Sequence, residues 1–314
     1  MTRYIDVTAM QQLVLQHGVA ALMAEMADCI REGFLRWDEF DQSHRINMGV
    51  GVGVLADAVT GYPMLLSEIT ILTALRTAAT SALAAKVLAR PNSRSMALIG
   101  NGSQSEFQAI AFMTQLGITE LRVFDVDRQA TDKLVANLSP YVTNGTLRIV
   151  RASSIREAVR GADIVTTVTA DKTNATILTD DLVKPGMHLN AVGGDCAGKT
   201  ELQPSILLRS KVFVEYEPQT RVRGELQQMQ QDFKTYALWQ VLAGRQPGRD
   251  TAEQVTLFDS VGFALEDLSA LRYIHALSQK LGVGSTVELI PALRNPKDLF
   301  ACAAAARATL RQAA

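Results

Sequence analysis

The stretch Ser95-Met96-Ala97-Leu98-Ile99-Gly100-Asn101-Gly102-Ser103-Gln104-Ser105-Glu106 decides the fold of this chain. A short apolar run ends at two glycines and then continues as a helical pattern. This is the layout of a strand, a tight turn and a helix N-terminus, where glycines let the backbone approach a diphosphate and helix N–H groups attract its charge. Ser105 holds the third small position, so the motif reads G-x-G-x-x-S. Alone, it is equally typical of an ordinary glycine turn before a helix.

An acidic residue follows at the spacing of a dinucleotide site. The next apolar run, Leu121–Phe124, ends at Asp125. In such sites an acid about 20 residues beyond the turn binds the adenosine ribose. A carboxylate here favours NAD, because it would repel the 2′-phosphate of NADP, although Arg128 leaves NADP tolerance open. The alternative is that Asp125 only caps a turn.

Length and composition are those of a two-domain globular protein. The chain has 314 residues, 47% of them apolar and 20% charged, with a formal net charge of -1. This charge gives no reason to expect a nucleic acid or an anionic membrane as a partner. We expect no signal peptide and no apolar segment long enough to cross a bilayer. The cysteines form no CxxC pair and the histidines show no metal-ligand spacing, so we expect a cytoplasmic protein without a metal.

The order of apolar segments predicts an α/β protein. From Ser95 on, strands alternate with helices, as in a Rossmann-type doubly wound parallel sheet whose ligands bind at the carboxyl ends of the strands. Before it, a hairpin at 50–66 and an Ala-rich helix at 68–88 predict a smaller α+β domain. We expect residues 1–77 and 284–314 to form this discontinuous domain, with a last helix from Asp298, and residues 78–283 to form the Rossmann domain.

Several polar residues stand at predicted strand ends. Asp195, in Gly193-Gly194-Asp195, could act as a general base or could satisfy turn amides. Lys199 could meet a cofactor phosphate or be solvated. Thr169 and Ser260 could hydrogen-bond a cofactor or be ordinary loop hydroxyls.

Two arginines could bind an anion. Arg76 lies in a helix that is otherwise apolar and small, and an unpaired buried charge is expensive, so Arg76 needs a negative partner. A substrate carboxylate, which a guanidinium can grip bidentately, is one candidate. An internal carboxylate, Glu68 or an aspartate, is the other. The pattern around Arg45 is that of a surface residue.

Taken together, these motifs resemble the ornithine cyclodeaminase/mu-crystallin family, in particular its bacterial ornithine cyclodeaminases, over nearly the whole chain. The matching stretches are Gly61–Glu68, Thr73–Ala79, Ile99–Phe107, Gly193–Leu202 and Leu257–Gly262.

The resemblance implies an enzyme that uses NAD. In that family a tightly held NAD takes a hydride from the Cα of L-ornithine, the δ-amine attacks the resulting imine, ammonia leaves, and the returned hydride gives L-proline. By resemblance, Asp195 is the catalytic aspartate acting on the δ-amine, Arg45 and Arg76 hold the α-carboxylate side of the substrate, and Val261 contacts its chain. The implied cofactor-binding positions are Arg76, Gly100, Gly102, Ser103, Gln104, Asp125, Thr169, Leu189, Asn190, Ala191, Val192, Lys199 and Ser260. A homodimer formed through the sheet of the first, substrate-binding domain is also implied.

The chain departs from the family in one segment. Between Arg45 and Gly53 relatives carry a longer stretch with paired strands, a lysine that faces the substrate and a threonine that meets the cofactor. Here only Ile46–Val52 separate the two positions, so the segment is shortened, and the first lysine of the chain is Lys86. A lost charge-assisted contact costs roughly 1.5–3 kcal/mol, so the resemblance implies a shortened and weakened enzyme. A smaller departure is Ala197, where the family commonly has proline.

Two other functions stay open. One is a relative that reduces cyclic imino acids or oxidises a small amino acid, which net consumption or production of NADH would reveal. The other is a nucleotide-binding protein without catalysis, as in the mu-crystallin branch, which would bind NAD and turn over no amino acid.

Overall fold

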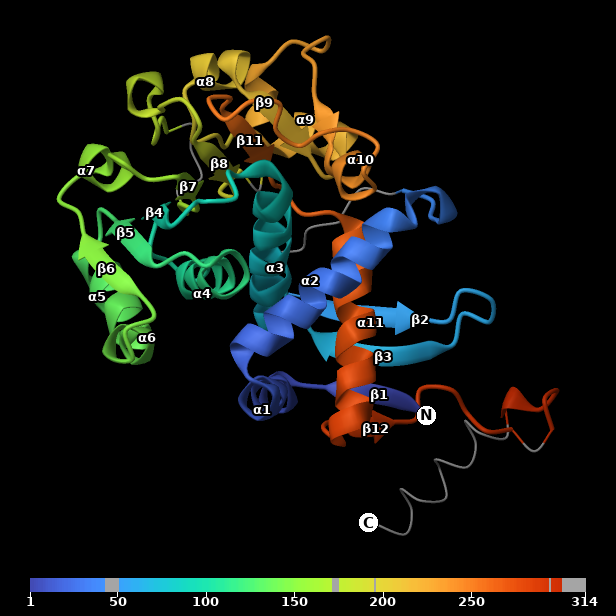
Figure 1. The fold of residues 1–314 in the computed structure, drawn as a ribbon. Coiled ribbons are helices and arrows are strands. Elements are labelled where there is room, and N and C mark those ends of the chain that lie inside the picture. The colour runs from blue at the N-terminus through green and yellow to red at the C-terminus, as the bar shows by residue number, and fades with distance from the viewer. Residues whose placement is uncertain (43–50, 171–174, 195, 294, 301–314) are drawn as a thin grey trace.

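A computed structural model describes residues 1–42, 51–170, 175–194, 196–293 and 295–300. Its larger part is the predicted Rossmann-type sheet, with eight strands that all pair in parallel and helices on both faces (Figure 1). The strands lie in the order β10 (Tyr236–Ala237), β9 (Lys211–Val214), β11 (Thr256–Asp259), β8 (His188–Ala191), β7 (Ile164–Thr167), β4 (Ser95–Ile99), β5 (Glu120–Phe124) and β6 (Arg148–Arg151).

Alternate residues of the strands build two separate cores. Met96 and Leu98 of β4 belong to the core formed with α3 (Thr70–Leu88), α4 (Ser105–Leu116) and α5 (Arg128–Asn137). Ala97 and Ile99 of the same strand belong to the core formed with α7 (Ile155–Val159) and α8 (Pro204–Arg209). Successive side chains of a strand point to opposite faces, so a strand covered on both sides reads as a continuous apolar run.

A second, four-stranded sheet joins segments from both ends of the described chain. Its order is β12 (Ser285–Val287), β1 (Thr2–Ile5), β3 (Pro63–Glu68) and β2 (Val52–Ala56). The predicted hairpin is confirmed, because β2 and β3 are antiparallel neighbours. The exact domain boundaries stay a prediction, and the last helix expected from Asp298 falls largely on residues 301–314, outside the described ranges.

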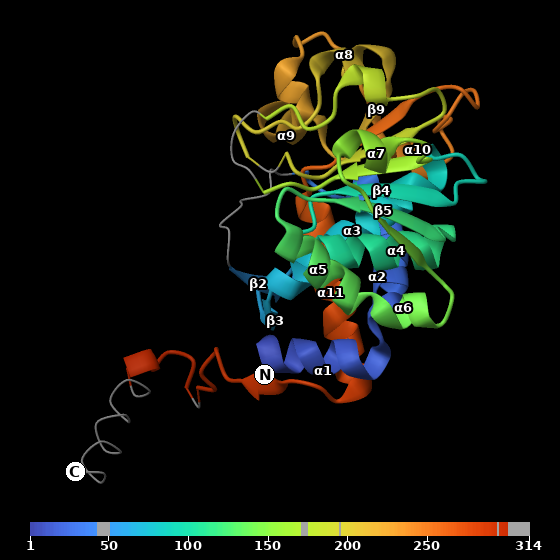
Figure 2. The same cartoon turned by 90° about the vertical axis from the view of Figure 1, so that its left-hand side faces the viewer.

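Three long helices connect the two sheets: α2 (Val19–Leu35), α3 and α11 (Ala264–Leu281) pack on one another, with α3 reaching the large sheet and α11 the small one (Figures 1 and 2). The remaining elements are α1 (Val7–His17), α6 (Ser139–Thr143), α9 (Glu217–Arg223), α10 (Leu238–Leu242) and the short 3₁₀ helices η1 (Trp37–Glu39), η2 (Asp180–Leu182) and η3 (Glu225–Gln228).

The helix α3 corrects one expectation. By length and composition its 19 residues could cross a membrane, whereas we expected no such segment. Yet 78% of the apolar window is buried inside the protein. Its alanines let α2 and α4 approach closely, so α3 has the character of a core helix.

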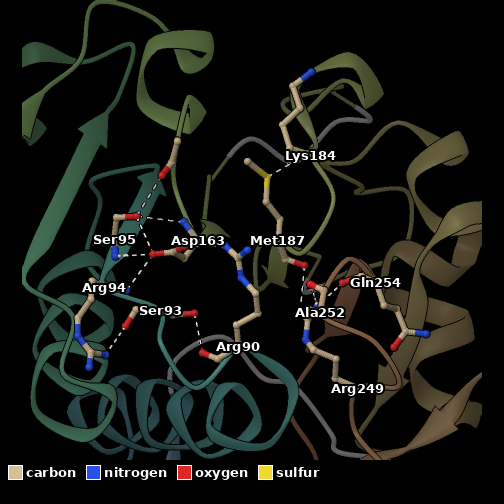
Figure 3. A network of polar contacts seen from close by, with 11 residues as sticks. Arg90, Ser93, Arg94, Ser95, Asp163, Lys184, Met187, Arg249, Ala252 and Gln254 are labelled. Atoms are coloured by element: carbon tan, nitrogen blue, oxygen red, sulfur yellow. Dashed lines mark hydrogen bonds and ion pairs between the residues drawn. The ribbon is translucent and has the colours of Figure 1, made fainter.

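Side chains also cross-link the amino ends of the large sheet (Figure 3). Asp163, just before β7, accepts the N–H groups of Arg94 (2.8 Å) and Ser95 (3.0 Å) at the start of β4, and pairs with Arg90 (2.7 Å). Burial acts to raise the pKa of Asp163, but these hydrogen bonds and Arg90 outweigh it and hold the pKa below its usual range. Asp163 thus ties the amino ends of the neighbouring strands β4 and β7 together.

His188, the first residue of β8, generates a test of stability against pH. It is fully buried, with Nδ1 3.0 Å from the Thr256 hydroxyl, and burial together with Arg249 lowers the pKa of His188 from 6.5 to about 3. The unfolded chain takes up a proton as pH falls below 6.5 and the folded chain does not, so stability is lost on acidification.

We expect the wild type to lose about 2 kcal/mol more unfolding free energy than His188→Gln between about pH 7 and about pH 5. Urea unfolding of both proteins at each pH measures this difference. The same pH dependence in both proteins would contradict a buried, neutral His188.

Candidate active site

The order of strands in the large sheet reverses between β4 and β7, and a crevice for a ligand forms at such a point. Gly100 follows β4 with φ +97°, which favours glycine. A Cβ atom at Gly100 would lie 2.8 Å from the carbonyl oxygen of Val168 and 3.0 Å from the nitrogen of Thr169. The turns after β4 and β7 thus lie in contact here. A glycine at position 100 allows this contact because it has no Cβ atom.

The turn after Gly100 offers an anion site. Within the described part of the chain, the N–H groups of Gly102, Ser103 and Gln104 make no hydrogen bond, and they precede the 12-residue helix α4. A Cβ at Gly102 would meet nothing within 4 Å. The Gly102 carbonyl accepts a hydrogen bond from Lys133 Nζ of α5 at 2.8 Å. Open amides beside a helix N-terminus fit a diphosphate group.

Asp125 follows β5 and lies beside this turn. Its Oδ2 accepts the N–H of Asn101 at 2.6 Å and its Oδ1 accepts the N–H of Asp127 at 2.8 Å. The carboxylate therefore does order two turns. Each oxygen has a second acceptor position, so the geometry also allows hydrogen bonds from ribose hydroxyls.

Thr169 and Lys199 meet at the carboxyl ends of β7 and β8. The Thr169 N–H and hydroxyl both donate to Glu201 Oε1, each at 2.7 Å, and Lys199 Nζ donates to the Thr169 carbonyl at 3.0 Å. Lys199 is only 4% exposed, so the expectation of a solvated lysine is wrong. Contact of either residue with a cofactor stays a prediction.

The residues predicted on β8 are only partly at the edge of the sheet. Leu189 and Ala191 are buried in the core shared with α7 and α8. The amide nitrogen of Asn190 points to the other face, 3.3 Å from the Thr166 hydroxyl. Only Val192, whose N–H donates to the Thr167 carbonyl at 2.9 Å, follows the strand. The structure thus brings Val192 to the site and encloses the side chains of Leu189 and Asn190.

Ser260 and Val261 follow β11 and are held by Glu215. The Ser260 hydroxyl donates to Glu215 Oε1 at 2.6 Å, and the Val261 N–H donates to Oε2 at 3.0 Å. Burial raises the pKa of Glu215, against the effect of these hydrogen bonds and of Arg76. Sequence reasoning missed Glu215, although an acid directly after the buried strand β9 is a visible signal.

Arg76 has the internal partners that a buried charge requires. It is 3% exposed, and its Nη1 and Nε lie 3.0 Å from Glu266 and 3.0 Å from Asp267 in the first turn of α11. The predicted partner Glu68 instead caps α3, accepting the N–H of Thr70 at 2.9 Å. Of the internal partners we considered, Glu68 is therefore wrong and an aspartate is right.

Arg76 also lies against the turn that follows Val261. A Cβ at Gly262 would lie 2.8 Å from Arg76 Nη1. Burial acts to lower the pKa of Arg76, but the carboxylates of Asp267, Glu266 and Glu215 outweigh it and hold the pKa above its usual value. Of the other residues predicted to act on substrate, Arg45 and Asp195 lie outside the described residues.

A separate cavity of about 350 Å³ opens beside the ends of β9 and β10. Trp37, Glu215 and Tyr216 are among its lining residues. Glu215 is the one lining residue it shares with the site at β7, β8 and β11, so this cavity lies beside that site and does not coincide with it.

Comparison with known proteins covers most of the chain. A model of the ornithine cyclodeaminase/mu-crystallin family matches residues 42–280. An ornithine cyclodeaminase of Brucella abortus biovar 1 is 49% identical over 333 residues, which cover 95% of this chain and 92% of the relative. Because 333 aligned positions exceed the 314 residues of this chain, that relative carries residues with no counterpart here.

Solved structures agree in fold. A lysine cyclodeaminase that recognises L-lysine, L-ornithine and L-2,4-diaminobutyric acid is similar with a TM-score of 0.82 and 23% identity, over 95% of this chain and 98% of that one. An archaeal alanine dehydrogenase dimer with bound NAD has a TM-score of 0.79 and 23% identity, over 92% and 99% of the two chains.

The glycine turn generates a matched pair of variants. Gly100→Ala would force a Cβ against the backbone of Val168 in a left-handed conformation, so we expect it to lower the unfolding free energy by at least about 2 kcal/mol. Gly102→Ala enters open space, and we expect a change below about 1 kcal/mol. Urea unfolding measures both values, and equal effects would contradict the close contact between the two turns.

Proposed function

This chain belongs to the ornithine cyclodeaminase/mu-crystallin family, and on that premise we propose that it is an enzyme converting L-ornithine to L-proline and ammonia with NAD. The observation that carries the proposal is the 49% identity to an ornithine cyclodeaminase over 95% of the chain. A cytoplasmic location is part of the proposal.

The residues at the carboxyl edge of the large sheet fit NAD. Three open amides before α4 would receive the diphosphate, Gly100 and Gly102 would let it approach, and Asp125 would receive the adenosine ribose. Thr169, Lys199 and Ser260 stand along the same edge of the sheet. When bound, NAD would supply reversible acceptance of a hydride, which interconverts an amine and an imine.

The protein's own residues would hold the substrate and move its protons. Arg76, together with Arg45, would bind the α-carboxylate. Its two ion pairs use Nη1 and Nε, and no hydrogen bond is made by Nη2 within the described residues, so one nitrogen is left for a ligand. Asp195 would orient the δ-amine and take its proton. Its loop begins at Gly193, whose N–H is fixed by Glu201 Oε2 at 3.0 Å.

We further propose that the shortened segment after Arg45 weakens this activity. The Brucella relative has residues that this chain lacks, and this chain has no lysine before Lys86 that could supply a substrate contact from the N-terminal region. A missing charge-assisted contact corresponds to roughly 1.5–3 kcal/mol, or about a ten- to hundredfold lower rate if it acts in the transition state.

A homodimer formed through the small sheet completes the proposal. Tyr4, Leu66 and Val54 are paired in register across β1, β3 and β2, so they share one face of the sheet. Gly53 faces the opposite way, since a Cβ there would lie 2.7 Å from Leu271 of α11. Val54 is 56% exposed, which leaves an apolar face open to a second copy. The archaeal alanine dehydrogenase of the same fold is a dimer.

The assay that tests the function measures ammonia and proline formed from L-ornithine with a catalytic amount of NAD. We expect both products in equal amounts without net NADH, because the hydride returns to the product. Asp195→Asn should lower kcat by about 10²–10⁴-fold while NAD binding is kept, since it removes the proposed base.

Folded protein that binds NAD and releases no ammonia from ornithine would overturn this function. Net NADH consumption with a cyclic imino acid would point to a reductase, and NAD binding without turnover of any amino acid would point to a non-catalytic protein.

The dimer is tested by charge on the exposed sheet face. Val54→Lys should shift the protein to monomers in sedimentation experiments, because a lysine would be buried without a partner. Val59→Lys is the matched control, since Val59 is 93% exposed in the hairpin turn and should leave the dimer intact. A monomeric wild type, or equal behaviour of the two variants, would contradict the proposed interface.

A further inference from the structure

Three buried acids link the loops at the carboxyl edge of the large sheet, and we name Asp259, Glu225 and Glu201 the carboxylate ladder. The ladder starts at Asp259, the last residue of β11. Its Oδ1 accepts the N–H of Glu225 at 2.9 Å and its Oδ2 accepts the N–H of Leu226 at 3.0 Å. Both carboxylate oxygens are therefore used to fix the start of η3.

Glu225 repeats the same arrangement one step further. Its Oε1 accepts the N–H of Glu201 at 2.7 Å and its Oε2 accepts the N–H of Leu202 at 3.0 Å. Gln228 Nε2 adds a third hydrogen bond, to Oε2, at 2.9 Å. Hydrogen bonds to a carboxylate are about twice as strong as those between neutral groups.

Glu201 ends the ladder at two loops of the candidate site. Its Oε1 accepts the Thr169 N–H after β7, and its Oε2 accepts the Gly193 N–H after β8, at 2.7 Å and 3.0 Å. These two loops carry Thr169 and lead into Asp195. Through three side chains, the end of β11 is thus connected to the ends of β7 and β8.

Glycines make room for the ladder. A Cβ at Gly193 would lie 2.2 Å from the Glu201 carboxylate, and a Cβ at Gly224 would lie 2.5 Å from that of Asp259. Neither distance is possible for a real side chain, so an alanine at either position would have to displace the facing carboxylate, and at Gly224 also the methyl group of Thr220, which lies 2.6 Å from the same Cβ position.

The ladder is energetically demanding. Asp259, Glu225 and Glu201 are each about 1% exposed or less. Burial raises the pKa of Asp259 to about 7 and that of Glu225 well above its usual value, and the neighbouring acids add to both effects. Buried acids of like charge are costly arrangements that concentrate at functional sites.

We propose that Glu225 is a positioning residue of the active site: through Glu201 it holds Thr169 after β7 and Gly193 after β8 in the arrangement that receives the cofactor. This inference rests on the proposed function for what the loops bind. The restraint of the loops themselves can be measured without any substrate.

The test compares Glu225→Gln with the wild type in NAD affinity, by calorimetry, and in amide hydrogen exchange of peptides covering residues 165–170 and 189–194. A glutamine keeps one acceptor oxygen and loses the other, so we expect faster exchange in these peptides and about a tenfold higher Kd for NAD. Exchange in β5 and β6, on the far side of the sheet, should not change.

Glu217→Gln is the matched control, since Glu217 lies on the neighbouring helix α9 and pairs with Arg221 at 2.7 Å outside the ladder. It should change neither the NAD affinity nor the exchange of the two loops. Gly224→Ala, which keeps every charge and displaces Asp259, should act in the same direction as Glu225→Gln.

Glu225→Gln with a Kd for NAD within about twofold of the wild type and unchanged loop exchange would overturn the proposal. If the variants fail to fold, amide hydrogen exchange measured at single residues of the wild type tests the proposal instead. The amides of Thr169, Gly193, Glu201 and Leu202 should exchange at least about a hundredfold more slowly than in an unstructured peptide, and free exchange there would overturn it. Should the wild type not bind NAD at all, the proposed function fails, while the exchange of these amides still judges the ladder.

Discussion

A parallel sheet leaves backbone N–H groups unpaired where its strands end, and in this protein carboxylates that are buried or partly buried satisfy them. Asp125 does so for the turn after β4, Glu201 for the turns after β7 and β8, and Glu215 for the turn after β11. An unpaired buried N–H is costly, so each acid determines the shape of the loop that it binds. Negative side chains thus fix the loops at the edge of the sheet that would bind a ligand, by accepting hydrogen bonds from their backbone N–H groups.

Among the described residues, Arg76 and Lys199 supply positive charge at this edge. Arg76 lies among the acids of α11 and Glu215, and Lys199 is buried against the Thr169 carbonyl. Arg76 therefore has a structural role before any ligand arrives, because it balances carboxylates that would otherwise repel one another. Structural pairing and substrate binding are compatible, since a guanidinium has five N–H donors.

The sequence was sufficient to predict the fold wherever the pattern is local. The alternation of strands and helices and the β2–β3 hairpin are confirmed, because runs of apolar residues and turn residues specify them. The strands β1 and β12 were not predicted. They have four and three residues and pair with partners distant in sequence: β12 with β1 across almost the whole chain, and β1 also with β3.

The sequence predicted which residues lie at the candidate site, but it did not predict which side chains hold them in place. The glycine turn and Asp125 follow from spacing, whereas the partner of Arg76 lies 190 residues away in α11, which no local pattern could show. Glu201 and Asp259 lie within stretches that carried the family resemblance, yet their importance rests on contacts with loops distant in sequence. Two residues of the chemistry, Arg45 and Asp195, stay predictions from resemblance.

The pairing of each ladder acid with a glycine has a consequence for how this protein can change over generations. A mutation that enlarges Gly193 must displace Glu201, and one that enlarges Gly224 must displace both Asp259 and Thr220. A displaced or shortened acid leaves amides without an acceptor. Neither step is neutral by itself, so glycine and acid must be inherited together. Anyone who transplants these loops into another scaffold has to move both members of each pair.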